Sequence, residues 1–325
     1  MRKNKSMRVA SLLLALTLIT SCFVGGTFAK YVTDAQGTDT ARVAKWGVTV
    51  QASGNLFGEH YYAKSDTAET SNKISASVQH SVDKEIALNG ISQIVAPGTK
   101  SDKGLTLSVK GKPEVMYTVT YSNAIDATKN KEIPNEDIWL KAGSYAVMVK
   151  TTAVTEENYV GKYYLDDSNY VKAQSEEWTA VKDKTWYEIN DETTVTANAD
   201  GNYYPLKWTV TKETGSTGTL DTTEYRNVET MNTALKNEFS VSNVKAKIEV
   251  NDVYTISWEW AFEQKQDGAD TILGHLMAKQ DNLENLDREY EVVVKDNDNY
   301  KKATVDTDYN LEVAFGAEIT VEQVD

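Results

Sequence analysis

The chain has 325 residues, a formal net charge of −14, 18 tyrosines and 4 prolines. An acidic surface repels nucleic-acid phosphates and anionic lipid headgroups, so the composition argues against both as partners. The single cysteine is Cys22. It precedes the predicted mature chain, which therefore lacks thiol chemistry and disulfides and suits a Gram-positive-type exterior.

The first 29 residues have the three parts of a secretory signal peptide. Residues 1–8 carry four positive charges, residues 9–24 are apolar apart from Ser, Thr and Cys, and residues 25–29 read GGTFA. This pattern predicts cleavage after Ala29, which would leave Lys30 as the new N-terminus. The apolar run is shorter than the roughly 18–20 residues that span a bilayer. We therefore expect a secreted protein that keeps no membrane contact after cleavage.

A lipid anchor is the alternative at this end of the chain, because Ser21-Cys22 loosely resembles a lipobox. A lipidated Cys22 would tether the protein to the outer face of the membrane. At the other end, neither a Leu-Pro-x-Thr-Gly sorting signal nor an apolar tail is present. The expected location is therefore the extracellular space or the cell-surface matrix.

The mature chain reads as a polar arm followed by a β-rich domain. Residues 30–41 form the predicted flexible N-terminal arm, and residues 42–325 form the predicted domain. The first expected strand spans 43–52, because Trp46, Val48 and Val50 share one face. Residues 53–80 read as irregular. Further strands separated by turns are expected at 91–95, 104–109 and 115–121, a spacing typical of a β-sandwich or jelly roll.

Residues 154–200 differ from their surroundings, because tyrosine, tryptophan and acidic turns are dense there. We interpret this segment as β-hairpins inserted into the sandwich. Its aromatic side chains either pack across strands or form an exposed carbohydrate-binding face. The residues of this candidate face are Tyr163, Tyr164, Tyr170, Trp178 and Trp186.

The last third of the chain alternates between strand and helix patterns. Strands are expected at 203–210, 247–250 and 253–262, and a final strand or bent pair at 309–321. A helix is expected over 222–239, where the apolar residues Val228, Met231, Leu235 and Phe239 recur every three or four positions. A second short helix is expected at about 270–280, with Asp270 as its cap. The fold class is therefore predominantly β, with one or two short helices.

No motif for catalysis or metal binding stands out. The three histidines do not form a His-Glu-x-x-His motif, and the chain has no nucleophile elbow or phosphate-binding loop. The acidic clusters at 296–299 and 306–308 lack the Gly and closing Glu of an EF-hand, so solvated turns explain them better than weak calcium sites. We expect neither catalytic residues nor a cofactor. A pair of glycosidase carboxylates is the enzyme alternative that sequence leaves open.

Several segments together resemble the TasA/camelysin family of secreted matrix proteins. The signal ending GGTFA before Tyr31 is similar to the signals that a SipW-type peptidase cleaves in that family. Further matching segments are 41–46 (ARVAKW), 96–100 (APGTK), 111–115 (GKPEV), 258–262 (WEWAF) and 270–274 (DTILG). The 154–200 segment has no counterpart in the smaller members.

This resemblance implies a jelly-roll sandwich that assembles into extracellular fibres. In the family, the N-terminal arm of one subunit inserts as a strand into its neighbour. Here the donor-strand arm would carry Tyr31, Val32 and Thr33, which cleavage after Ala29 would free. The implied partners are copies of the same chain, together with other matrix proteins or polysaccharide. The competing hypothesis is a cell-surface adhesin or carbohydrate-binding module that uses the aromatic hairpins.

Overall fold

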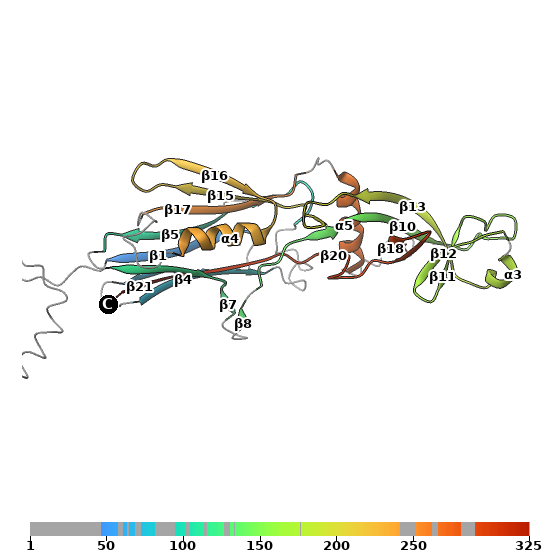
Figure 1. The fold of residues 1–325 in the computed structure, drawn as a ribbon, viewed down its shortest axis with the longest axis horizontal. Helices are drawn as coiled ribbons and strands as arrows, with labels where there is room; N and C mark the ends of the chain where they lie inside the picture. Colours follow the sequence, from blue (N-terminus) through green and yellow to red (C-terminus); the bar gives the residue numbers. More distant parts are fainter. Residues whose placement is uncertain are drawn as a thin grey trace, which may run out of the picture.

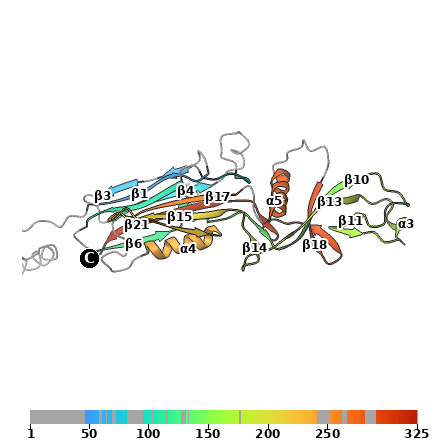
Figure 2. The same ribbon diagram turned by 90° about the horizontal axis from the view of Figure 1, so that it is seen from above.

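Strands dominate the protein and build two lobes that lie end to end, as Figure 1 and, from above, Figure 2 show. The computed structural model describes residues 47–57, 61–63, 65–68, 73–81, 95–101, 104–113, 116–126, 131–132, 134–175, 177–240, 251–261, 266–280 and 290–324. Within these residues, no helix is both long and apolar enough to cross a bilayer.

The first lobe is a sandwich of two antiparallel sheets. Its larger sheet has the strand order β16 (Leu220–Tyr225), β15 (Lys207–Glu213), β17 (Val253–Glu259), β5 (Gly104–Gly111), β1 (Val48–Asn55) and β3 (Ser65–Ala68). The facing sheet has the order β2 (Tyr61–Ala63), β4 (Lys73–Ser81), β21 (Ala314–Gln323) and β6 (Tyr117–Ser122). In β6 and β17, buried residues alternate with more exposed ones, as expected for strands that present one face to a core.

Large aromatic side chains fill the space between the two sheets. Trp258 stacks on Phe57 with ring centroids 5.5 Å apart, and Trp208 meets the same ring edge-on at 6.0 Å. Both indole N–H groups are satisfied: Trp258 donates to the carbonyl of Leu56 at 2.7 Å, and Trp208 donates to Asp137 at 2.9 Å. The sandwich therefore buries these two indoles without leaving their N–H groups unpaired.

Helix α4 (Val228–Phe239) closes one side of the sandwich beside β6 and β15 (Figure 1). Its N-cap is Asn227, whose side chain accepts a hydrogen bond from the Thr230 N–H at 2.9 Å. The Tyr121 hydroxyl of β6 donates to Asn232 on the helix at 2.6 Å. Four buried apolar residues at helical spacing face the core: Val228, Met231, Leu235 and Phe239.

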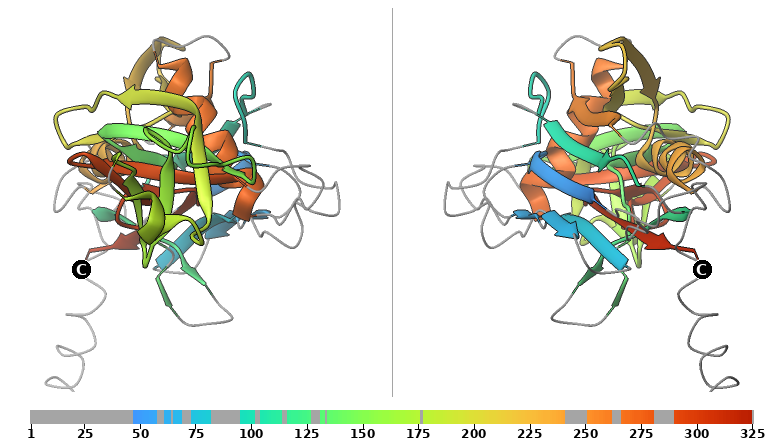
Figure 3. Two further views of the ribbon diagram at one scale, coloured as in Figure 1. Left: turned by 90° about the vertical axis from the view of Figure 1, so that its right-hand side faces the viewer. Right: turned by 90° about the vertical axis from the view of Figure 1, so that its left-hand side faces the viewer.

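The second lobe is a closed six-stranded barrel, seen end-on in the left view of Figure 3. Its strand order is β10 (Gly143–Thr151), β13 (Trp186–Val195), β11 (Tyr163–Asp166), β12 (Asn169–Lys172), β19 (Asn299–Lys302) and β18 (Tyr290–Asp296), and β18 pairs back to β10. The short helix α3 (Trp178–Val181) lies at the far tip (Figure 1). Two widely separated segments of the chain therefore close one barrel.

Helix α5 (Asp267–Gln280) lies where the two lobes meet. Its buried Ile272 and Leu273 belong to the same hydrophobic cluster as the sandwich core and the barrel residues Tyr145 and Val147. A three-stranded sheet also joins the lobes; its strands are β14 (Asn202–Tyr203), β9 (Trp139–Lys141) and β20 (Tyr309–Asn310). A two-stranded ribbon, β7 (Ile125–Asp126) and β8 (Lys131–Glu132), completes the described strands.

The fold confirms the predominantly β class, whereas the jelly-roll connectivity stays a prediction. Three helices are described where one or two were expected, because the four-residue α3 gives no sequence signal. The interpretation of residues 53–80 as irregular is wrong, since β2, β3 and β4 lie there. The cap prediction for Asp270 is also wrong, because α5 begins at Asp267. Expected strand residues at 43–46, 91–94 and 247–250 lie outside the described residues.

Candidate functional site

The predicted cleavage site and donor-strand arm lie outside the described residues. This applies to Ala29, Lys30, Tyr31, Val32 and Thr33 alike. The described chain begins at Gly47, directly before β1, at the end of the sandwich remote from the barrel (Figure 1). Any segment that precedes Gly47 is therefore attached at this end of the molecule.

The aromatic residues predicted as a binding face are mainly buried in the barrel lobe. Tyr163 and Tyr170 belong to one cluster, in which the Tyr163 ring meets Tyr300 edge-on at 5.5 Å. Tyr164 and Trp186 belong to a second cluster at the tip, with their ring centroids 5.6 Å apart. Trp178 packs against this second cluster and is half-buried. The rings do not form an exposed planar row, so their arrangement supports cross-strand packing rather than sugar stacking.

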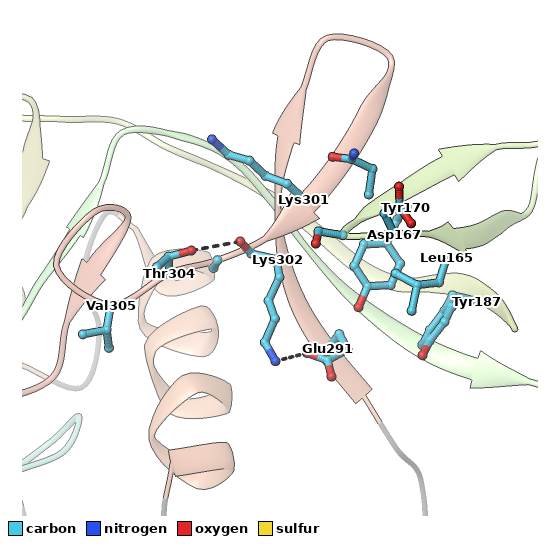
Figure 4. A pocket seen from close by; sticks show the side chains of 12 residues that line it. Leu165, Asp167, Tyr170, Tyr187, Glu291, Lys301, Lys302, Thr304 and Val305 are labelled. Atoms are coloured by element: carbon cyan, nitrogen blue, oxygen red, sulfur yellow. Dashed lines mark hydrogen bonds and ion pairs between the residues drawn. The ribbon is translucent and has the colours of Figure 1, made fainter.

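The barrel wall carries an open pocket of about 710 Å³. It lies between the β11–β12 hairpin, strands β18 and β19, and the segment that follows β19 (Figure 4). Leu165, Tyr170 and Tyr187 supply its apolar surface. Its polar and remaining lining residues are Asp167, Ser168, Asn169, Glu291, Lys301, Lys302, Ala303, Thr304 and Val305.

Two tight hairpin turns position the pocket residues. Asp166 pairs with Asn169 across the turn of β11–β12, and Asp167 in this turn has φ 52°. Asn297 occupies the equivalent turn of β18–β19 with φ 57°. Asp and Asn are the non-glycine residues that best tolerate this left-handed backbone, which explains the acidic turn sequences. The cluster at 296–299 is accordingly a hairpin turn.

Charge on the pocket wall centres on Glu291. Its carboxylate forms ion pairs with Lys279 of α5 and with Lys302, the latter at 3.6 Å. Burial raises the pKa of Tyr170, and the nearby charge of Glu291 raises it further. The Tyr170 ring meets Tyr187 edge-on at 5.0 Å. The Tyr170 hydroxyl is therefore a neutral hydrogen-bonding group at physiological pH.

Taken together, the pocket offers a small apolar surface rimmed by two carboxylates, an amide and ammonium groups. This arrangement can hold a polar organic ligand by hydrogen bonds. Among the described residues, no group of three or more His, Cys, Asp or Glu side chains is arranged to hold a metal ion. The sequence drew attention to Tyr170 but missed Glu291 and residues 301–305. The β-branched run Val292–Val294 shortly before the Asp-Asn turn was the signal for this hairpin.

Two buried carboxylates outside the pocket serve the packing of helices. Asp137 accepts hydrogen bonds from the Trp208 indole and from the Val228 N–H at 2.8 Å, next to the start of α4. Burial raises its pKa to about 7, and these two donors oppose the rise. Asp270 accepts a hydrogen bond from the Tyr203 hydroxyl at 2.8 Å, and burial raises its pKa as well.

The chain matches no protein-family model, no curated protein and no solved structure.

Proposed function

We propose that this protein is a secreted structural protein, a TasA-like subunit or accessory of extracellular or biofilm-matrix fibres. Subunits would join head to tail when the N-terminal arm of one adds as a strand to the next. The proposal rests on the export signal, on the segments that resemble the TasA/camelysin family, and on one feature of the sandwich.

The observation that carries the proposal is the free edge of β16. This six-residue strand ends the larger sheet, no described strand pairs with its outer side, and its side chains are exposed or half-exposed. Backbone N–H and C=O groups at such an edge are a template for an added strand. Helix α4 packs mainly beside the β6 edge of the other sheet, although it also touches β16.

The position of the chain start favours pairing between molecules. The predicted arm, residues 30–41, precedes the first strand of the sandwich, and 12 extended residues span roughly 40 Å. An arm attached there can reach the sandwich of a neighbour. Tyr31 and Val32 would supply its apolar side chains. Because such a contact joins different surfaces of the two subunits, it does not close and can propagate into a filament.

The first test is electron microscopy of protein that starts at Lys30 beside protein that starts at Val43. We expect filaments from the longer form and none from the shorter, because only the longer form carries the arm. Monomers from both forms, over a range of pH and calcium concentration, would contradict the fibre proposal.

The acceptor edge is tested by the double substitution Thr222→Lys with Thr223→Lys in β16. Lysines on an edge strand oppose the addition of a further strand, so we expect filaments to be lost. Val160→Lys is the matched control, because Val160 is an exposed residue of the barrel lobe. Filaments that survive the β16 substitutions would place the acceptor elsewhere.

The pocket in the barrel wall favours a second candidate function, a cell-surface adhesin or carbohydrate-binding module. Its tyrosines and the carboxylate of Asp167 are groups that bind sugar hydroxyls. Titration calorimetry with neutral oligosaccharides tests this candidate. Binding that Asp167→Ala weakens would support it, and an absence of heat with a panel of matrix polysaccharides would count against it.

A further inference from the structure

Four side chains converge on the side of the sandwich where α4 meets β15 and β17. Lys212 of β15 places its Nζ 2.7 Å from Oε1 of Glu238 on α4 and 3.3 Å from Oδ2 of Asp252. The Tyr254 hydroxyl donates a hydrogen bond to the same Glu238 oxygen at 2.8 Å. One amine therefore lies between two carboxylates, one of which a tyrosine holds in place.

The reacting groups are shielded from water to different degrees. The Asp252 side chain is 2% exposed and the Lys212 side chain 27%, whereas Glu238 is 44% exposed. The Tyr254 ring lies below the ammonium group at 5.4 Å, and the Phe239 ring packs 4.6 Å from Tyr254. The amine and Asp252 thus meet in a largely apolar setting, while Glu238 keeps contact with solvent.

The second oxygen of Asp252 is held by the backbone. The Gly215 N–H, in the turn after β15, donates to Asp252 Oδ1 at 3.0 Å. A Cβ at Gly215 would lie 2.3 Å from the carbonyl oxygen of Asn251. Only glycine therefore allows this turn to approach so closely. The result is a backbone donor aimed at one carboxylate oxygen while the other oxygen faces the lysine.

We propose that Lys212 and Asp252 form an intramolecular isopeptide bond, with Glu238 as the catalytic proton carrier. The arrangement contains each group that this condensation needs: an amine, a buried carboxyl group within reach, a carboxylate base and a donor for the developing oxyanion. The inference is independent of fibre assembly, because all of these groups belong to one chain.

The step balances without an added reagent. Glu238 takes a proton from the Lys212 ammonium, and the neutral Nζ attacks the Asp252 carboxyl carbon. The Gly215 N–H stabilises negative charge on Oδ1 in the tetrahedral intermediate. Glu238 then returns its proton to Oδ2, which takes up the second proton from Nζ and leaves as water. The N–C bond forms, the C–Oδ2 bond breaks, and the carboxylate of Glu238 is restored.

Glu238 is essential to this scheme because Lys212 does not become neutral by itself. Desolvation opposes the charge on Lys212, but its hydrogen bonds to Glu238 and Tyr254 outweigh that effect and raise its pKa. Direct transfer of a proton from Lys212 Nζ to Glu238, across their 2.7 Å contact, supplies the neutral amine. Without the Glu238 carboxylate, we expect the two partners to remain unbonded.

The test is the intact mass of the purified full-length chain under denaturing conditions. We expect the wild type to be lighter than its sequence by one water molecule, with its Lys212 and Asp252 tryptic peptides joined. Glu238→Gln and Lys212→Arg should both have the unmodified mass. Lys207→Arg is the matched control, because Lys207 forms an exposed ion pair on the same strand, and it should keep the loss of water.

An unmodified wild-type mass with separate Lys212 and Asp252 peptides would overturn the proposal, because it would leave only an ion pair. This measurement does not depend on how well any variant folds. Loss of water that persists in Glu238→Gln would overturn the role of Glu238. Circular dichroism of Glu238→Gln verifies that the folded state is retained.

Discussion

The sandwich and the barrel bury aromatic side chains in different ways. The sandwich packs Trp208, Trp258 and Phe57 into one cluster that also includes α5 and the base of the barrel. The barrel divides its rings, chiefly tyrosines, between two small clusters. A hydrophobic cluster that many elements share unfolds as a unit, whereas a small satellite can open locally. The comparison predicts a stable centre and a more easily opened tip.

The largest effect is expected from Trp258→Ala. This side chain is buried between the sheets, and its N–H satisfies the Leu56 carbonyl. Its removal should lower the free energy of unfolding by about 3–5 kcal/mol. Urea unfolding followed by far-ultraviolet circular dichroism measures the change. Coincident loss of hydrogen-exchange protection in both lobes would support the shared core, and loss confined to the sandwich would contradict it.

Trp186→Ala sharpens the comparison at the barrel tip. Trp186 packs with Tyr159 and Tyr164 in the smaller cluster. We expect a loss of about 3 kcal/mol that is confined to the tip, because few elements share this cluster. Hydrogen exchange should accelerate in β11 and α3 and stay unchanged in β17. Equal acceleration in β17 would show that the two lobes open together.

The buried carboxylate of Asp137 gives the sandwich a pH dependence between acidic and neutral pH, whereas the raised pKa of Tyr170 and Tyr300 concerns the alkaline range in the barrel. Its folded pKa, raised to about 7 from 3.8, means that the folded state binds the proton more tightly. The contribution of this group to the free energy of unfolding is therefore greatest below pH 4 and falls as the pH rises through 7. Asp137→Asn should remove a few kcal/mol of this dependence. Urea unfolding of the wild type and of Asp137→Asn at pH 4.5 and pH 7.5 measures this change. If the free energy of unfolding differs between the two pH values by the same amount in both proteins, Asp137 is not the group responsible.

The smallest effect is expected from Lys184→Ala. Lys184 pairs with Asp166 at 2.7 Å, but both side chains are roughly half-exposed. Solvent and salt screen such an exposed ion pair, so it contributes little to stability. Thermal unfolding at low and high salt should therefore barely distinguish this variant from the wild type. A large loss would mean that the β11–β12 hairpin is more tightly coupled to the barrel than its exposed surface indicates.

Sequence patterns predicted two strands of the larger sheet well. The run at 253–262 became β17, in which buried and partly exposed residues alternate, and the run at 104–109 became β5, which is buried over most of its length. Helix α4 was found from its spaced apolar residues, although it begins at Val228 after the β16 strand. Residues 53–80 contain polar strands such as β3, whose pairing with β1 is long-range and leaves no local pattern.

The closure of the barrel and its pocket could not be predicted from local sequence patterns, because both depend on strands that are far apart in the chain. The hairpins at 163–172 were expected, but their closure requires β18 and β19, more than a hundred residues later. A pocket made by Tyr170 and Glu291 exists only after that closure. The convergence of Lys212, Glu238 and Asp252 likewise depends on how α4 docks. Sequence spacing cannot supply such juxtapositions, because each partner belongs to a different element.

The central position of β21 has a consequence for the order of folding. This C-terminal strand lies between β4 and β6, pairing with both. A chain that emerges from its N-terminus cannot complete the four-stranded sheet until residues 314–323 are free. The barrel waits for β18 and β19 in the same way. Both lobes therefore complete their strand pairing only after residues 290–323 have been synthesised. Until then, we expect neither lobe to reach its final packing.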